Sequence, residues 1–299
     1  MSPATTVICD GLVWPESPRW RAGQLWITEA FAHDSGVRAF SSDGTRTLSI
    51  PVSGGPAGMD FLSDGTAVLA AAFDRKILMR RPGESEFSTF LDLDGIATYP
   101  NELIVGPDDR IYISDSGFQV GAEPYVSGRL IVAETDGNAR VVSDNLPFPN
   151  GLTISPDGRI LTVGESFAGR LSRYQIGANG ALSDHHVLVA FDDLGVVEDL
   201  EKTFTRKSAP DGICLDAAGN VWVANPLEAK VVCISPDGKP IAEVVLSQGG
   251  IACMLGGEDG RTLYVCTGDP VAMTEKKGRI EKEEVDVPSA GYPRSDIFV

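Results

Sequence analysis

The sequence predicts an all-β chain folded as a six-bladed β-propeller, in which four-stranded antiparallel blades surround a central channel. One pattern predicts this fold: an apolar run, a polar turn and a second apolar run recur six times along 299 residues. The copies start roughly 40 to 60 residues apart, which is the period of a propeller blade. A second hairpin pattern follows within each interval, so every interval holds the four strands that one blade needs.

Local turn chemistry predicts the individual elements. Asn150 opens the run GLTISPDGRILTVGE, in which Asp157 and Gly158 separate two apolar stretches. An Asp-Gly pair between alternating apolar residues is a strong signal for a β-hairpin, so we expect these pairs to be structural. The six copies begin at Glu16, Gly58, Asn101, Asn150, Asp211 and Ile251. The clearest second hairpins span residues 37–50, 128–143, 169–184 and 230–245.

A generic β-sandwich or barrel, or two all-β domains, would also contain short strands with frequent turns. Neither explains the sixfold period, and no linker rich in Pro, Gly and Ser separates the copies, so we expect one domain over residues 1–299. The ring is expected to close by pairing residues 278–287 with residues 4–10, which would protect open sheet edges. Residues 192–209 form a charged insertion between blades four and five; such a segment is a surface elaboration, a lid or a subunit contact.

Composition excludes several classes of function. The formal net charge of −17 disfavours nucleic-acid binding, which needs a basic surface. No stretch approaches 18 consecutive apolar residues, and the N-terminal residues lack a signal-peptide pattern, so we expect no membrane span and no secretion. The five cysteines match no zinc motif and lie mostly in apolar runs, which favours buried free thiols in the cytoplasm. We expect a monomer or a small homo-oligomer that acts on a small molecule.

The first positions of the repeated pattern suggest a metal site. Four of them carry a side-chain oxygen: Glu16, Asn101, Asn150 and Asp211. Equivalent positions of a propeller converge on its channel, where two carboxylates without a cation would repel each other. The oxygen-only set favours Ca²⁺, Mg²⁺ or Mn²⁺, and Zn²⁺ is a further candidate. Asn and Asp before glycine are also common turn formers, which is the alternative interpretation of Asn150-Gly151 and Asp211-Gly212.

The loops after the second strand of each blade are expected to rim the mouth of the channel. They contain candidate pocket walls and polar side chains, among them Phe118 and Glu165. Other candidate walls are Phe31, Phe73, Tyr125 and Phe167. No G-x-S-x-G motif is present, so a covalent serine mechanism is not indicated.

Five motifs carry a resemblance to a known family. They are PESPRW around Glu16, YPNELIVGPDDRIYISD around Asn101, FPNGLTISPDGRILTVGES at Asn150, APDGICLDAAGNVWVA at Asp211 and ACMLGGEDGRTLYV at Cys253. They resemble the senescence marker protein/gluconolactonase family, whose relatives include luciferin-regenerating enzymes and squid-type diisopropylfluorophosphatases. The resemblance implies a six-bladed propeller with metal ligands Glu16, Asn150 and Asp211. It also implies that Asn101 binds the metal or the substrate, that Asp211 is the general base, and that the reaction is lactone hydrolysis, commonly of sugar lactones.

The chain departs from this family at two positions. Members that act on aldonolactones in animals carry an arginine and an aspartate where this sequence has Tyr99 and Glu102. A tyrosine offers one hydroxyl and an apolar face instead of a guanidinium fork, so a less polar lactone or ester competes with a sugar lactone. The candidate substrate-binding residues are Tyr99, Asn101, Glu102, Phe118 and Glu165.

These observations favour a divalent-metal-dependent lactonase. In that hypothesis one cation polarises the carbonyl of a cyclic ester, and water attacks with Asp211 or a metal-bound hydroxide as the base. Hydrolysis of a phosphotriester or of another ester on the same metal site is an alternative. A non-catalytic binding propeller with a structural cation is a third hypothesis.

Overall fold

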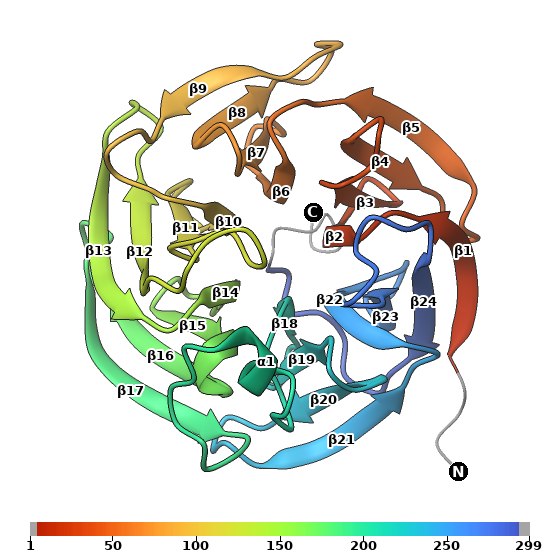
Figure 1. Cartoon of the computed structure of the whole chain (residues 1–299). Helices are drawn as coiled ribbons and strands as arrows, with labels where there is room; N and C mark the ends of the chain where they lie inside the picture. Colours follow the sequence, from red (N-terminus) through yellow and green to blue (C-terminus); the bar gives the residue numbers. More distant parts are fainter. Residues whose placement is uncertain (1–4, 293–299) are drawn as a thin grey trace.

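Six four-stranded antiparallel sheets surround a central axis as the blades of a β-propeller (Figure 1). The structure is a computed structural model and describes residues 5–292. The predicted fold class is confirmed. No helix in the described part of the chain is long and apolar enough to cross a membrane.

The strands of the first three blades follow one another in chain order. The first blade contains β2 (Pro15–Arg21), β3 (Gln24–Glu29), β4 (Gly36–Phe40) and β5 (Arg46–Pro51). The second contains β6 (Pro56–Phe61), β7 (Ala67–Ala71), β8 (Lys76–Arg80) and β9 (Ser88–Asp92). The third contains β10 (Pro100–Val105), β11 (Ile111–Asp115), β12 (Gly128–Ala133) and β13 (Ala139–Leu146).

The remaining blades differ in one insertion and in the closure of the ring. The fourth blade contains β14 (Pro149–Ile154), β15 (Ile160–Glu165), β16 (Arg170–Ile176) and β17 (Leu182–Ala190), with the 3-10 helix η1 (Ser166–Ala168) after β15. Helix α1 (Leu200–Thr203) precedes the fifth blade, which contains β18 (Ile213–Leu215), β19 (Val221–Asn225), β20 (Lys230–Ile234) and β21 (Pro240–Val245). The sixth contains β22 (Gly249–Gly256), β23 (Thr262–Gly268), β24 (Gly278–Glu284) and β1 (Thr6–Leu12).

The first strand of the chain closes the ring as the outermost strand of the last blade. β1 pairs antiparallel with β24, with Thr6 opposite Lys282 and Leu12 opposite Gly278 (Figure 1). The predicted pairing of the two ends is therefore confirmed within the described residues. This arrangement gives the last blade a fourth strand, so its edge matches those of the other five.

The hydrophobic core lies between the blades. Six clusters of buried apolar side chains each join two adjacent blades, and β-branched residues supply many of their members. One cluster packs Val68 and Ile77 of the second blade against Ile111 and Ile131 of the third. Because the blades pack face to face around the whole ring, the innermost strands hold fixed positions around the channel.

The Asp-Gly turns lie at one face of the ring. In an antiparallel meander, the connections between strands one and two and between strands three and four share one end. Gly44 and Gly158 adopt φ of 87° and 70° in these turns, and Asp43 and Asp157 accept hydrogen bonds from backbone N–H groups two residues later. The predicted structural role of these Asp-Gly pairs is confirmed. The opposite face carries the segments that lead into the innermost strands.

The innermost strands carry irregular pairing close to their first residues. The register between β10 and β11 shifts between Pro100 and Leu103, and the register between β14 and β15 shifts between Pro149 and Leu152. A similar shift follows Glu16 in β2. A bulge changes the direction in which a side chain points, and bulges are frequent beside functional sites. In this protein the bulges lie at the first positions of the repeated sequence pattern and so affect the side chains there.

The glycine after Asn150 serves close packing. Asn150 and Gly151 both lie within β14, so this pair is not a turn. A Cβ atom on Gly151 would lie 2.2 Å from the carbonyl oxygen of Asp211 on the neighbouring blade. Likewise, a Cβ atom on Gly212 would lie 2.4 Å from Cβ of Ala252. The glycines let adjacent innermost strands approach closely, which brings the side chains beside them together.

Candidate active site

A cavity of about 160 Å³ lies at the channel mouth and takes lining residues from all six blades. The four oxygen-bearing side chains predicted from the repeat all line it, as does Tyr99. The structure therefore brings together Glu16, Asn101, Asn150 and Asp211, which lie far apart in the sequence. This convergence follows from the equivalent positions that they occupy at the starts of four blades.

Two amide side chains connect the third, fourth and fifth blades. Asn101 Nδ2 donates to Asn150 Oδ1 at 3.0 Å, and Asn150 Nδ2 donates to Ser166 Oγ at 3.3 Å. Ser166 Oγ in turn donates to the carbonyl oxygen of Pro210 at 2.6 Å. Ser166 thus fixes the orientation of the Asn150 amide and joins it to the segment that carries Asp211. Because Nδ2 of Asn150 is engaged by Ser166, its Oδ1 is the atom turned toward Asn101.

Three aromatic residues of the cavity wall occupy equivalent positions in three copies of the repeated pattern. Each lies two residues before a polar site residue, with a proline between them: Trp14 before Glu16, Tyr99 before Asn101, and Phe148 before Asn150. Tyr99 was predicted from the sequence but Trp14 and Phe148 were not, although the recurring order of aromatic residue, proline and polar residue marks both.

The backbone at two of these aromatic positions is unusual. Trp14 and Phe148 have φ of 46° and 60°, which is rare for large side chains and often marks a functional site. Trp14 also contacts the polar cluster directly, because its Nε1 donates to Glu16 Oε1 at 2.7 Å. The repeated tripeptide therefore supplies both the polar floor of the cavity and part of its apolar wall.

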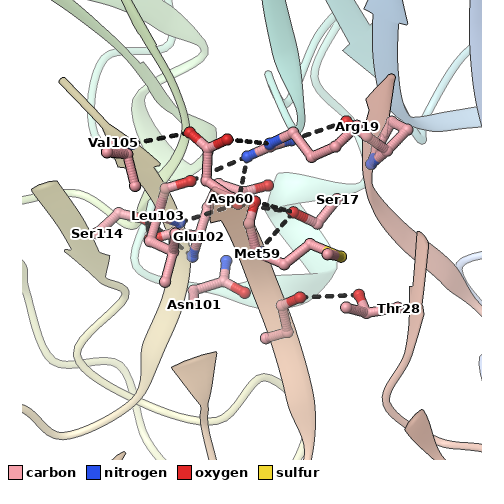
Figure 2. A network of polar contacts seen from close by, with 12 residues as sticks. Ser17, Arg19, Thr28, Met59, Asp60, Asn101, Glu102, Leu103, Val105 and Ser114 are labelled. Carbon is pink, nitrogen blue, oxygen red and sulfur yellow. Dashed lines mark hydrogen bonds and ion pairs between the residues drawn. The ribbon is translucent and has the colours of Figure 1, made fainter. Parts of the chain in front are cut away.

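A buried ionic network lies behind the polar cluster (Figure 2). Arg19 Nη2 lies 3.1 Å from Glu102 Oε1, and Arg19 Nε lies 3.8 Å from Asp60 Oδ1. Ser17 Oγ donates to Glu102 Oε1 at 3.0 Å and accepts from the backbone N–H of Met59 at 2.8 Å. These contacts link the first three innermost strands and fix the backbone on either side of the cavity residues.

Burial raises the pKa of both carboxyl groups in the cavity. Desolvation, with the charges of Asp211 and Glu102, raises the pKa of Glu16 well above its usual value. Desolvation and the charge of Glu102 raise the pKa of Asp211 to about 8, although a hydrogen bond from Asn150 opposes the shift. The raised pKa values show that nearby positive groups do not balance the negative charge that these carboxylates would carry.

The residues present fit a hard divalent cation. Asp60, Glu102 and Asp211 supply three buried carboxyl groups and Glu16 supplies a partly buried one, against one guanidinium from Arg19. Two of these carboxylates and the side-chain oxygen of Asn150 face the same cavity, which is an oxygen-only donor set. No cluster of three or more His, Cys, Asp and Glu side chains able to hold a metal occurs among the described residues, so an amide oxygen would be needed.

Three of the predicted substrate contacts lie outside the cavity lining. Glu102 points to Arg19 and Ser17 behind the cavity. Glu165 is fully buried and accepts hydrogen bonds from Arg170 and Ser172. Phe118 packs behind the wall, with its ring 5.5 Å from that of Phe167.

The loops after the second strands line the cavity in five blades. Ala30 and Phe31 follow β3, Phe167 follows β15, and Leu227 follows β19. The second blade is the exception, because Phe73 packs beside the cavity wall and not in it; its ring lies 6.1 Å from that of Tyr99. The loops after the second strands therefore line the mouth of the channel as expected in every blade except the second.

The insertion 192–209 forms one side of the cavity. It lies between β17 and β18, and α1 lies close to the inner ends of blades four and five (Figure 1). Leu200, Thr203 and Phe204 of this segment line the cavity. The segment thus contributes directly to the cavity wall and is more than a surface elaboration.

Comparison with known proteins places the chain in a family. The family model described as the SMP-30/Gluconolactonase/LRE-like region matches residues 14–269. The chain belongs to this family. The matched region includes Glu16, Asn101, Asn150 and Asp211, and it also includes Trp14, Tyr99 and Phe148.

Individual members of the SMP-30/gluconolactonase/LRE-like family are distant from this chain. A 6-deoxy-6-sulfogluconolactonase of Pseudomonas putida is 28% identical over 167 residues, which are 55% of this chain and half of that protein. A gluconolactonase of Zymomonas mobilis subsp. mobilis is 23% identical over 304 residues, covering 93% of this chain and 82% of that protein.

Solved structures support the same fold. A luciferin-regenerating enzyme superposes with a TM-score of 0.78 at 17% identity, covering 95% of this chain and 97% of its own. Regucalcin from Agrobacterium tumefaciens, described as a calcium-binding protein, also gives 0.78, at 18% identity and 96% coverage of both chains. At these identities the similarity establishes the fold alone.

Proposed function

We propose that this protein hydrolyses a lactone with one divalent cation held by Glu16, Asn150 and Asp211. The observation that carries the proposal is the convergence of two carboxylates and two amides from four blades on one small cavity. The names of family members add support, because they include gluconolactonases and lactonases, and regucalcin is described as calcium-binding.

The cation would supply Lewis-acid polarisation of the lactone carbonyl and would offset the negative charge that develops on its oxygen. Glu16 is prepared for such a role, since the hydrogen bond from Trp14 Nε1 fixes its carboxylate at the cavity floor. Asn150 is held in the same way by Ser166. Preorganised ligands of this kind lose little conformational freedom when the cation binds.

Asn101 is proposed to contact the substrate. Its Nδ2 group donates to Asn150 Oδ1 at the floor of the cavity, and an amide nitrogen carries a second hydrogen for donation to the lactone. Tyr99 provides a further donor, because burial raises the pKa of its hydroxyl and keeps it protonated. Both groups would orient the ester so that its carbonyl faces Glu16, Asn150 and Asp211, the residues that would hold the cation.

Asp211 is proposed to accept the proton of the attacking water, for which it must be ionised. Burial raises its pKa to about 8, and a bound cation would favour the ionised form by offsetting the negative charge. Asp211 takes one proton as the oxygen of water bonds to the carbonyl carbon. When the ring C–O bond breaks, this proton passes from Asp211 to the leaving ring oxygen, and the product is a hydroxy acid whose carboxyl group releases a proton at neutral pH. A carboxylate has two oxygens, so one can serve the cation while the other takes the proton. Positioned proton transfer contributes roughly 10²–10⁴-fold to rate.

A pH-stat assay of simple lactones tests this proposal with three matched variants. Asp211→Asn and Glu16→Gln should each lower kcat/KM by at least about 10²-fold, because each removes a cation ligand, and the first also removes the base. Asp157→Asn, the same change in an exposed turn of the opposite face, should leave the rate unchanged. Equal rates in Asp211→Asn and wild type would overturn the proposed role of Asp211.

A further inference from the structure

We infer that the substrate carries an apolar alkyl or aryl group, which packs between the insertion 192–209 and the wall formed by Phe148 and Phe167. The inference rests on the proposed function only for the position of the ester, which lies at the polar floor. It concerns the rest of the ligand and identifies the insertion as the element that determines specificity.

The cavity has two chemically different ends. Its floor carries Glu16, Asn101, Asn150 and Asp211, whereas Leu200 and Phe204 of the insertion line the cavity together with aromatic rings of the other blades. Most lining residues outside the floor are apolar. A ligand with one polar ester and one apolar substituent matches this division, because each end then meets a surface of its own kind.

A polyhydroxylated lactone would find few partners above the floor. The hydroxyl of Ser166 already donates to Pro210 O, and the hydroxyl of Thr203 already donates to Asp199 O. Tyr99 and Gln119 are the other polar residues that line the cavity in the described part of the chain. A sugar hydroxyl that loses water without gaining a partner is disfavoured, so several such groups would weaken binding strongly.

Charge argues in the same direction. Among the described residues that line this cavity, none is Arg, Lys or His. A substrate that carries a carboxylate, phosphate or sulfonate remote from the ester would therefore lack a cationic side chain beside it. An uncharged substituent meets no such cost.

The insertion is positioned firmly enough to select a ligand. The carbonyl oxygen of Phe167 accepts hydrogen bonds from the backbone N–H of Val197 and from Arg206 Nη1, at 2.9 and 3.0 Å. The fully buried Arg206 side chain also pairs with Asp192 at 3.0 Å. Asn225 holds the end of the segment through its side chain. The wall that contains Leu200 is therefore attached to both neighbouring blades.

The size of the cavity limits the ligand. A volume of about 160 Å³ resembles cavities of about 150 Å³ that hold one benzene-sized molecule. A five- or six-membered lactone ring would occupy most of it, and a chain on that ring would extend along Leu200 toward the half-exposed Phe204. We expect a monocyclic lactone with a short apolar chain or a small fused aromatic ring.

A homologous series measures this preference. γ-Butyrolactone, γ-hexalactone and γ-nonalactone differ only in chain length, and glucono-δ-lactone serves as the polar comparison. We expect kcat/KM to rise about fourfold for each methylene until the cavity is full, and to be lowest for glucono-δ-lactone. A higher kcat/KM for glucono-δ-lactone than for γ-nonalactone would overturn the inference and leave the proposed function intact.

Variants of the insertion locate the effect. Leu200→Ala and Phe204→Ala should reduce the ratio of kcat/KM for γ-nonalactone over γ-butyrolactone by about tenfold each, because each removes apolar surface that the alkyl chain would cover. The control is Leu194→Ala, because Leu194 lies in the same insertion, is 53% exposed and does not line the cavity. An unchanged ratio in both Leu200→Ala and Phe204→Ala would contradict the assignment of the insertion as the specificity element.

Binding of ketones separates this inference from catalysis. Cyclopentanone and 2-hexylcyclopentanone share the ring shape but cannot be hydrolysed, so ligand-observed NMR reports the cavity alone. We expect the hexyl ketone to bind wild type more tightly than cyclopentanone and to lose that advantage in Leu200→Ala. Equal binding of the two ketones would overturn the inference even if lactones are hydrolysed; tighter binding of the hexyl ketone without any hydrolysis would support it while the proposed function failed.

Discussion

Arg19 Nη2 lies 3.1 Å from Glu102 Oε1, and both side chains are buried behind the cavity that carries the candidate site. The same guanidinium lies near Asp60, so one cation serves two carboxylates on neighbouring innermost strands. Buried ion pairs of this kind add little net stability when intact, but removing one partner leaves an uncompensated charge. The network is therefore a sensitive point of the fold.

Replacing Arg19 should destabilise the protein strongly. Arg19→Met leaves Glu102 and Asp60 buried without a cation, which should lower the free energy of unfolding by about 3–5 kcal/mol in urea titrations. Arg46→Met is the matched control, because Arg46 is exposed in β5 and should shift this free energy by less than about 0.5 kcal/mol. Similar effects of the two substitutions would show that the network does not contribute as described.

The protonation of Asp60 should make stability depend on pH. Burial raises the pKa of Asp60 to about 6 in the folded protein, against about 3.8 for an exposed aspartate. The folded state therefore binds this proton more tightly, so the contribution of Asp60 is fully present below about pH 4 and is lost as pH rises through about 6. A shift of two pKa units limits the change to about 3 kcal/mol.

Comparison with Asp60→Asn isolates this effect. The difference in free energy of unfolding between wild type and Asp60→Asn should fall between pH 4 and pH 7, because only the wild type carries the titrating group. Urea titrations at four pH values across this range measure that difference. If the two stability profiles run parallel, Asp60 does not titrate with a raised pKa.

A methyl group at Gly151 should separate two innermost strands. Gly151→Ala places a Cβ atom 2.2 Å from Asp211 O, so the strands must shift and the polar cluster must distort. We expect a loss of about 1–3 kcal/mol of stability, together with weaker binding of divalent cations by calorimetry. Gly177→Ala is the control, since the nearest atom there lies at 3.5 Å. Cation binding by Gly151→Ala equal to that of wild type would contradict the proposed close approach.

The cysteines should differ in reactivity. Four thiols are buried, those of Cys214, Cys233, Cys253 and Cys266. Desolvation raises the pKa values of Cys214, Cys233 and Cys266. The sulfur of Cys253 lies 3.7 Å from that of Cys214. Cys9 is partly exposed. A thiol-disulfide reagent should therefore titrate about one thiol in the folded protein and all five after unfolding. Rapid reaction of several thiols in the folded state would contradict the packing.

The sequence predicted the scaffold well because the relevant signals are local. Asp157-Gly158 specifies a hairpin wherever it lies, and six recurrences of the pattern specify six blades. The convergence of Glu16 and Asp211 followed from the same repeat, since equivalent positions around a ring face one channel. The pairing of β1 with β24 was predictable because a ring of blades needs a closed edge.

The directions of individual side chains were less predictable. Asn101 faces the cavity whereas Glu102, its neighbour in β10, faces Arg19, because successive strand residues point to opposite sides and the shift of register sets which side is which. No sequence pattern marks the position of that shift. The position of Leu200 in the cavity wall could not be predicted for another reason. The insertion is held in place by long-range contacts with Phe167 and Asn225, which no local sequence pattern marks.

Dependence of lactone hydrolysis on a divalent cation is tested most directly by the hydrolysis rate of γ-nonalactone in chelator-treated protein as the cation is returned. We predict negligible activity after chelation, recovery that saturates at about one Ca²⁺, Mg²⁺, Mn²⁺ or Zn²⁺ per chain, and no recovery in Asp211→Asn at the same concentrations. Full activity in the chelated protein, at a rate unaffected by any of these cations, would contradict a catalytic role for a cation held by Glu16, Asn150 and Asp211.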